Sequence, residues 1–176
     1  MQFYADNPNN PSQCRGATGQ QWAAAPGWSS PILIDTDQRN QGCQLAFGVY
    51  DGDGSVAGLS LSYTWQASHG GNGATQCGNQ GTHQAPVNQF RAFGPLLGAD
   101  TDQREGWCNL TFSVSGRSDV VVDVQWFPEF ENNGQCQGYV PQGQYRTAYP
   151  NGPLTIGVDT DSRNGGCWLS LRLRQA

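Results

Sequence analysis

Residues 100–112 read DTDQREGWCNLTF, and two closely similar stretches stand at residues 35–47 (DTDQRNQGCQLAF) and 159–171 (DTDSRNGGCWLSL). The Asp-Thr-Asp-x-Arg sequence is unchanged in all three, and the spacing from its first aspartate to the cysteine is constant. A Gln-Cys pair also repeats upstream of each stretch, at Cys14, Cys77 and Cys136. Self-similarity at a period of about sixty residues predicts three tandem copies of one unit. The predicted copies span residues 1–58, 59–119 and 120–176.

The residues that follow each repeated cysteine alternate between apolar and polar types, as in residues 108–114. A β-strand places every second side chain on the same face, so such a run predicts a half-buried strand. A second alternating run leads to an aromatic residue in each copy, and we expect all three aromatics, Tyr4, Trp65 and Trp126, to lie in the core. Short alternating runs between Gly-rich polar turns predict an all-β fold, with four strands in each copy.

The copies are joined by short turn sequences, residues 51–54 (DGDG) and 115–118 (SGRS). Turn residues between two alternating runs favour β-hairpins, and shared hairpins would make the three copies pack as one domain over residues 1–176. Pairing the first strand with the last would close the ring and cover both sheet edges. A β-trefoil with pseudo-threefold symmetry fits this arrangement and is the favoured prediction, with a β-prism as the alternative.

The chain contains six cysteines, only two histidines and no C-x-x-C motif, a set that favours disulfides over a zinc site. Disulfides predict an oxidising compartment, so the expected location is secreted and extracellular. The count allows several pairings, of which two respect the repeat. The favoured set lies within the copies and is Cys14–Cys43, Cys77–Cys108 and Cys136–Cys167. The alternative set joins neighbouring copies and is Cys43–Cys77, Cys108–Cys136 and Cys167–Cys14.

The formal net charge is −5, and all nine basic residues are arginines. Nucleic-acid binding needs a basic patch that collects phosphates, and binding to an anionic membrane needs the same kind of surface. We therefore expect neither partner, and no apolar run is long enough to insert into a membrane. The oligomeric state does not follow from these properties.

The Asp-Thr-Asp-x-Arg turns are the predicted ligand sites, because a turn between strands is where binding residues usually stand. If each turn begins extended, its two carboxylates point the same way and repel unless something neutralises them. The arginine, a calcium ion or the hydroxyl groups of a sugar could do so. A purely structural interpretation is that Asp and Arg pin the turn. The predicted ligand residues of the turns are Asp35, Asp37, Arg39, Asp100, Asp102, Arg104, Asp159, Asp161 and Arg163, and the six aspartates are the candidate calcium ligands.

Two tryptophans complete the predicted sites. Trp168 is on the outward register of its strand, and Trp107 stands where the other copies carry glycine. An exposed indole ring is a natural platform for the apolar face of a sugar. The alternative role of both rings is to cover the neighbouring disulfide.

Three identical turns predict a multivalent carbohydrate-binding protein, a lectin with up to three sites and with glycans as partners, because repetition turns weak sugar affinities into avidity. One alternative is an extracellular binder of another kind, either a protease inhibitor or a structural or adhesive envelope protein. A secreted hydrolase is a third interpretation. We expect no enzyme, because His69, His83, Glu129 and Glu131 each occur in one copy only and form no acid–base pair that the sequence identifies.

Overall fold

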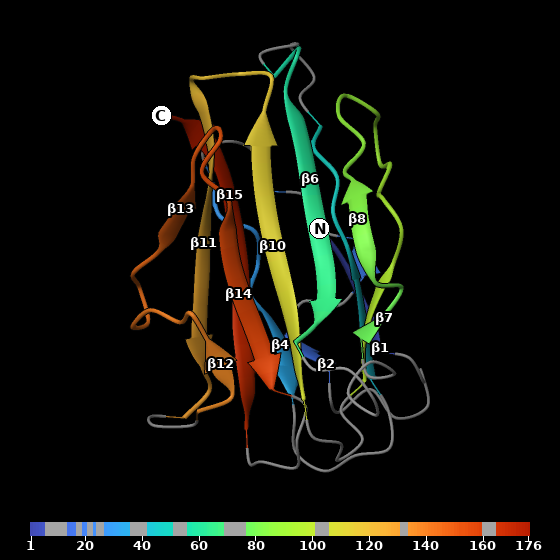
Figure 1. The fold of residues 1–176 in the computed structure, drawn as a ribbon, viewed down its shortest axis with the longest axis vertical. Helices are drawn as coiled ribbons and strands as arrows, with labels where there is room; N and C mark the ends of the chain where they lie inside the picture. Colours follow the sequence, from blue (N-terminus) through green and yellow to red (C-terminus); the bar gives the residue numbers. More distant parts are fainter. Residues whose placement is uncertain are drawn as a thin grey trace.

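A computed structural model describes residues 1–5, 14–16, 19–20, 23, 27–35, 42–50, 56–68, 77–100, 106–130, 134–159 and 165–176. Every regular element within these ranges is a β-strand, so the predicted all-β class is confirmed. The strands form three antiparallel five-stranded sheets. The long strands run along the longest axis of the molecule (Figure 1). No helix in the described ranges could cross a membrane.

The three sheets are here called I, II and III. Sheet I contains, in hydrogen-bonded order, β3 (Gly19–Gln20), β1 (Gln2–Ala5), β5 (Gly42–Ala46), β9 (Leu97–Asp100) and β7 (Cys77–Gly78). Sheet II contains β12 (Cys136–Gln137), β14 (Leu154–Asp159), β10 (Trp107–Ser115), β6 (Ser60–Ala67) and β8 (Gly81–Gln84). Sheet III contains β13 (Arg146–Ala148), β11 (Val120–Pro128), β15 (Gly166–Gln175), β4 (Ile32–Asp35) and β2 (Cys14–Gly16).

Each sheet combines three strands from one segment of the chain with two from another. Sheet I takes β1, β3 and β5 from residues 1–58 and β7 and β9 from residues 59–119. Sheet II takes β6, β8 and β10 from residues 59–119 and β12 and β14 from residues 120–176. Sheet III takes β11, β13 and β15 from residues 120–176 and β2 and β4 from residues 1–58. Within the described ranges each segment therefore contributes five strands where the sequence predicted four, because the short strands of two to four residues carry too few residues to show an alternation.

The two predicted junction hairpins are not formed. Strands β5 and β6 lie in different sheets, and so do β10 and β11. Instead, the first and last long strands of one segment pair with each other, as β6 and β10 do from Ser60↔Ser115 to Ala67↔Cys108. The prediction was wrong because a period of two fixes which face of a strand is buried but not which strand lies beside it.

The first and last strands do not pair either. Strand β1 lies between β3 and β5, and β15 lies between β11 and β4. Residues 1–58 still pair with residues 120–176, but through β4, which lies beside β15. The outermost strand of every sheet is described as only two to four residues long, and short edges limit pairing with other molecules.

One core lies between the sheets and consists of the apolar side chains on their inward faces. Trp65 and Trp126 are buried in it, as predicted. The third predicted aromatic was wrong by one position, since Phe3 is fully buried while Tyr4 is only partly so. Phe3 pairs with Leu45 as Trp65 pairs with Leu110. The error arose because the loop between this aromatic and the next cysteine differs in length between segments.

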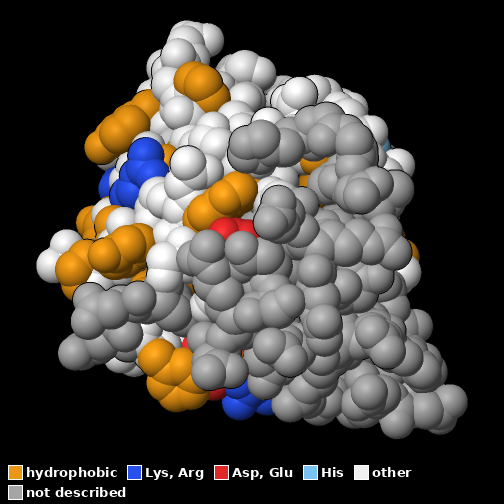
Figure 2. All heavy atoms as spheres, turned by 60° about the horizontal axis from the view of Figure 1, so that its bottom comes forward, with side chains coloured by type: hydrophobic (Ala, Val, Ile, Leu, Met, Phe, Trp, Pro, Cys, Tyr) orange, Lys and Arg blue, Asp and Glu red, His pale blue; other side chains and the backbone are white. Residues whose placement is uncertain are grey.

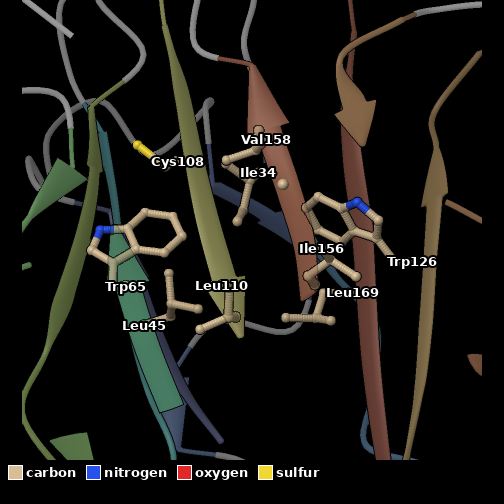
Figure 3. A pocket seen from close by; sticks show the side chains of 10 residues that line it. Ile34, Leu45, Trp65, Cys108, Leu110, Trp126, Ile156, Val158 and Leu169 are labelled. Atoms are coloured by element: carbon tan, nitrogen blue, oxygen red, sulfur yellow. The ribbon is translucent and has the colours of Figure 1, made fainter. Parts of the chain in front are cut away.

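A void of about 10 Å³ with an apolar lining lies within this core. The side chains of Trp65 and Trp126 approach it from opposite sides (Figure 3). Its volume is close to that of one probe sphere of water size. The interior is therefore filled by side chains and leaves no room for a ligand at the void, so the functional surface must be sought outside the core.

Three disulfides are present, as the cysteine count predicted, and no cysteine is free. The pairs are Cys14–Cys43, Cys77–Cys108 and Cys136–Cys167. Each pair joins strands of two different sheets: β2 to β5, β7 to β10, and β12 to β15. The bridges therefore connect sheet III to sheet I, sheet I to sheet II, and sheet II to sheet III. They are consistent with the oxidising extracellular compartment that the sequence suggests.

Candidate functional site

Each predicted turn begins at the last residue of a strand, at Asp35 of β4, Asp100 of β9 and Asp159 of β14. Each of these aspartates stands opposite a residue of another segment. The cross-strand pairs are Gly166↔Asp35, Gly42↔Asp100 and Trp107↔Asp159. Sheet pairing thus brings every turn beside a strand that lies far from it in the sequence. In Figure 1, β10 and β15 begin at the lower end of the view, where β14 ends.

The remaining turn residues lie outside the described part of the chain. They are Asp37, Arg39, Asp102, Arg104, Asp161 and Arg163, together with the side chain of Asp100. Among the residues that are described, no group of three His, Cys, Asp or Glu side chains is arranged to hold a metal ion. The calcium hypothesis, which needs the second aspartate of each turn, therefore stays a prediction.

The first aspartates of two turns are buried. Asp35 and Asp159 are each only 2% exposed, although both lie on the outward register of their strands. Asp35 accepts a hydrogen bond from Nη2 of Arg15 at 3.0 Å. A carboxylate that is buried to this degree offers little surface to a ligand.

Arg15 links Asp35 to a second acid. Its Nη2 also lies 2.5 Å from Oε1 of Glu129, which follows β11. Partial burial alone would lower the pKa of the Arg15 guanidinium, but the hydrogen bonds and charges of Glu129 and Asp35 raise it above its ordinary value. The carboxylates of Asp35 and Glu129 therefore share the Arg15 guanidinium group.

Gly166 makes this arrangement possible. It lies opposite Asp35, and a Cβ at this position would come within 2.7 Å of the Cα of Asp35 and 2.3 Å of the carbonyl oxygen of Ile34. No side chain other than hydrogen fits there without moving β15 away from β4. Arg15 and Glu129 meet at this part of the sheet, where the backbone N–H of Glu129 donates a hydrogen bond to the carbonyl oxygen of Gly166 at 2.9 Å.

The second carboxylate oxygen of Glu129, Oε2, differs from Oε1 because it is buried and has no hydrogen-bond partner among the described residues. An unpaired buried acceptor is costly, and a water molecule or a ligand hydroxyl at this point would remove the cost. Sequence reasoning named Glu129 without a role and missed Arg15, because the residues after the other two Gln-Cys pairs, Gly78 and Gln137, share no chemistry with it.

The two predicted tryptophans are both partly exposed on outward faces. Trp107 faces Asp159 directly across β10 and β14, so it belongs to the turn of the third segment and not to the turn that precedes it in sequence. Trp168 lies between Phe127 and Leu33 on sheet III, two pairs along from Gly166 and Asp35 and therefore on the same face of the sheet. Figure 2 shows acidic side chains beside hydrophobic ones at this end of the molecule.

No family model, curated protein or solved structure matches the chain. The described residues combine partly exposed indole rings, charged groups held by ion pairs and strand ends that carry polar turns. Such a set suits hydrogen bonding to a polar ligand with an apolar face.

Proposed function

We propose that the protein binds carbohydrate at the ends of β4, β9 and β14, where the Asp-Thr-Asp-x-Arg turns begin. The pairing of Trp107 with Asp159 carries the proposal, because it sets an indole ring directly beside one of the turns. The ring would stack against the C–H face of a sugar. The polar groups of the turn would bind the hydroxyl groups, which fix the orientation of the sugar and give specificity.

The two aspartates of a turn have different roles in this proposal. The first, Asp35 or Asp159, is buried and holds the turn in place. The second aspartate and the arginine that follows provide the contacts with the ligand. The ligand residues proposed from the repeat are Asp37, Arg39, Asp102, Arg104, Asp161 and Arg163, with calcium as the candidate bridging ion.

The sites would be unequal in strength. The position opposite the first aspartate is Trp107 in one site but glycine in the other two, Gly166 and Gly42. We expect the site at Asp159 to bind most tightly because it has the aromatic platform. The site at Asp35 would use Trp168 and a ligand hydroxyl at Glu129. Binding at several unequal sites still gives avidity on a surface that displays many glycans.

We further infer that the three segments are related by pseudo-threefold symmetry. The cyclic sharing of strands among sheets I, II and III supports this inference. Three separate five-stranded sheets favour a prism-like arrangement over the trefoil, whose strands close into a single barrel. Disulfides across all three contacts between sheets suit a secreted protein.

A glycan array, run once with calcium and once with a chelator, tests the proposed function. We expect binding to a defined glycan family, and we expect the combined Asp37→Ala, Asp102→Ala and Asp161→Ala variant to lose it. Asp119→Ala is the matched control, because it removes an exposed carboxylate that belongs to none of the turns. Loss in the chelator alone would establish a bridging calcium ion.

A second pair of variants isolates the aromatic platform. Trp107→Phe keeps a ring beside Asp159 and should retain most of the binding, whereas Trp107→Ala should weaken it by about 1–3 kcal/mol at that site. If the protein binds no glycan in either condition, or binds equally well without the three aspartates, the turns serve folding alone and the proposal is wrong.

A further inference from the structure

The outer face of sheet III carries a cluster of charged residues around one buried carboxylate. Asp123 of β11 is fully buried and lies opposite Arg172 of β15. Its Oδ2 accepts hydrogen bonds from Nε and Nη2 of Arg172, at 3.0 and 2.5 Å, and from Nε of Arg174 at 2.7 Å. Its Oδ1 accepts one from Thr147 at 2.8 Å. Asp123 therefore fixes the orientation of two guanidinium groups.

Aromatic side chains surround the first of these guanidinium groups. The central carbon of Arg172 lies 4.5 Å from the ring centroid of Trp28 and 4.9 Å from that of Tyr145. Tyr145 and its neighbour Tyr149 are 44% and 55% exposed. Hydrophobic and arginine side chains are interspersed along the left edge of Figure 2, the side on which β12 and β13 lie in Figure 1.

The cluster has unused capacity for an anion. Two guanidinium groups face one carboxylate, which leaves a local charge of +1 in a chain whose net charge is −5. Within the described ranges, Nη1 of Arg172 donates no hydrogen bond. A guanidinium group that is already oriented and has free N–H groups is well suited to a carboxylate or sulfate group.

The fold does not require this cluster. Sheet II has the same strand order, and its positions corresponding to Asp123 and Arg172 are Ser62 and Ser113, which also face each other. Removing a charged pair from water costs free energy that packing alone does not demand. A cluster that is absent from the equivalent sheet and leaves aromatic rings exposed is better explained by a ligand than by folding alone.

We propose that this face of sheet III is a second binding site, specific for an acidic saccharide. The anionic group would bind Nη1 of Arg172 and the outer edge of Arg174, and the sugar ring would lie against Tyr145 and Tyr149. Asp123 would act as a positioning residue. The inference takes its ligand class, a saccharide, from the proposed function, but the site is separate from the turns and adds a requirement for negative charge.

Isothermal titration calorimetry with three probes tests the site. The probes are an oligogalacturonate, the same oligosaccharide with its carboxyl groups reduced to alcohols, and an oligosaccharide of equal length that bears sulfate groups in place of carboxyl groups. We expect the acidic probe to bind, with an affinity that falls as salt rises, and the reduced probe to bind at least about tenfold more weakly. Binding of the sulfated probe alone would identify sulfate as the anionic group.

Variants then locate the binding. Arg172→Gln and Tyr145→Ala should each weaken the acidic probe about tenfold or more, while Arg172→Lys should give an intermediate loss because it keeps the charge but not the planar fork. Trp107→Ala, in the proposed turn site, should have no effect on it. Tyr145 is exposed, so its variant should unfold at an unchanged temperature and separate lost binding from lost folding.

The outcomes distinguish this inference from the proposed function. If neutral glycans bind and acidic ones do not, the second site does not exist and the turn sites stand. The same conclusion follows if Trp107→Ala loses binding of the acidic probe while Arg172→Gln and Tyr145→Ala keep it. If the acidic probe depends on Arg172 and Tyr145 while the turn variants change nothing on the array, the second site stands and the proposed turn sites fall. If none of the probes binds, the second site is wrong.

Discussion

Asp123 shows how a single buried charge ties stability to pH. Burial alone would raise the pKa of its carboxyl group, but hydrogen bonds from Arg174, Arg172 and Thr147 outweigh burial and lower the pKa below its ordinary value of 3.8. A carboxyl group with a lowered pKa in the folded state stabilises the fold at every pH above its unfolded pKa. This contribution is lost as the pH falls through the folded pKa.

The first prediction follows from this lowered pKa of Asp123. The contribution of Asp123 to the free energy of unfolding should be constant from neutral pH to about pH 4 and should decline below it. Asp123→Asn should remove this acid-dependent part and cost about 3 kcal/mol at pH 7, because both arginines lose their charged partner. Urea denaturation at a series of pH values measures both effects. An acid limb unchanged in the variant would contradict the assignment.

The two core tryptophans give the second prediction, since they occupy equivalent positions with different hydrogen bonding. Nε1 of Trp65 donates to the carbonyl oxygen of Gly98 at 3.0 Å, whereas Nε1 of Trp126 is buried without a partner among the described residues. Trp65→Phe removes the hydrogen bond to Gly98, but Trp126→Phe removes an unpaired buried donor. We therefore expect Trp126→Phe to be less destabilising by about 1–2 kcal/mol. Equal losses in chemical denaturation would contradict this.

At the scale of the elements, the sequence predicts strand faces well and strand partners poorly. The alternation of residues 43–49, 59–65 and 108–114 correctly identifies their buried positions. The sequence predicts hairpins at the junctions because neighbouring strands in sequence often pair. The same alternation is equally compatible with pairing β6 to β10, which the structure has. Partner choice depends on the packing of three sheets around one core, which no local pattern contains.

The candidate site could likewise be predicted from the sequence only in part. The repeat identifies where the turns begin, and outward register identifies Trp168. The neighbours of each turn could not be predicted, because Trp107 and Gly166 reach their aspartates through pairing between distant segments. Arg15 and Asp123 occur in one segment only, so a search for repeated chemistry passes over them. Unrepeated residues become visible as a group once the pairing is known.

Gly166 gives the third prediction, at the contact between β15 and β4. Gly166→Ala places a methyl group against the backbone of Ile34 and Asp35 and forces the two strands apart. We expect a loss of about 2–3 kcal/mol in the free energy of unfolding. Gly152→Ala is the matched control, because its added Cβ would meet no atom closer than 3.5 Å, and it should change stability by about 0.5 kcal/mol or less. Equal effects of the two variants would show that β15 and β4 tolerate separation.

At the scale of the whole molecule, the chain passes between sheets at every junction. No sheet consists of a single segment, so none is complete without strands from a second segment. Most pairings join residues far apart in sequence, and closing such contacts costs chain entropy. The three disulfides lower this entropy cost of folding. Each one already holds two distant parts of the chain together in the unfolded state.

The last prediction concerns the equivalence of these three contacts. The cysteines of the pairs are 29, 31 and 31 residues apart, so the chain-entropy model gives each bridge nearly the same contribution, about 3–4 kcal/mol. Replacing both cysteines of any one pair by alanine should therefore lower the free energy of unfolding by a similar amount in all three cases. Guanidinium denaturation of the three double variants measures this. If one variant loses far more than the others, that contact between sheets holds the molecule together, and the three sheets do not contribute equally to its stability.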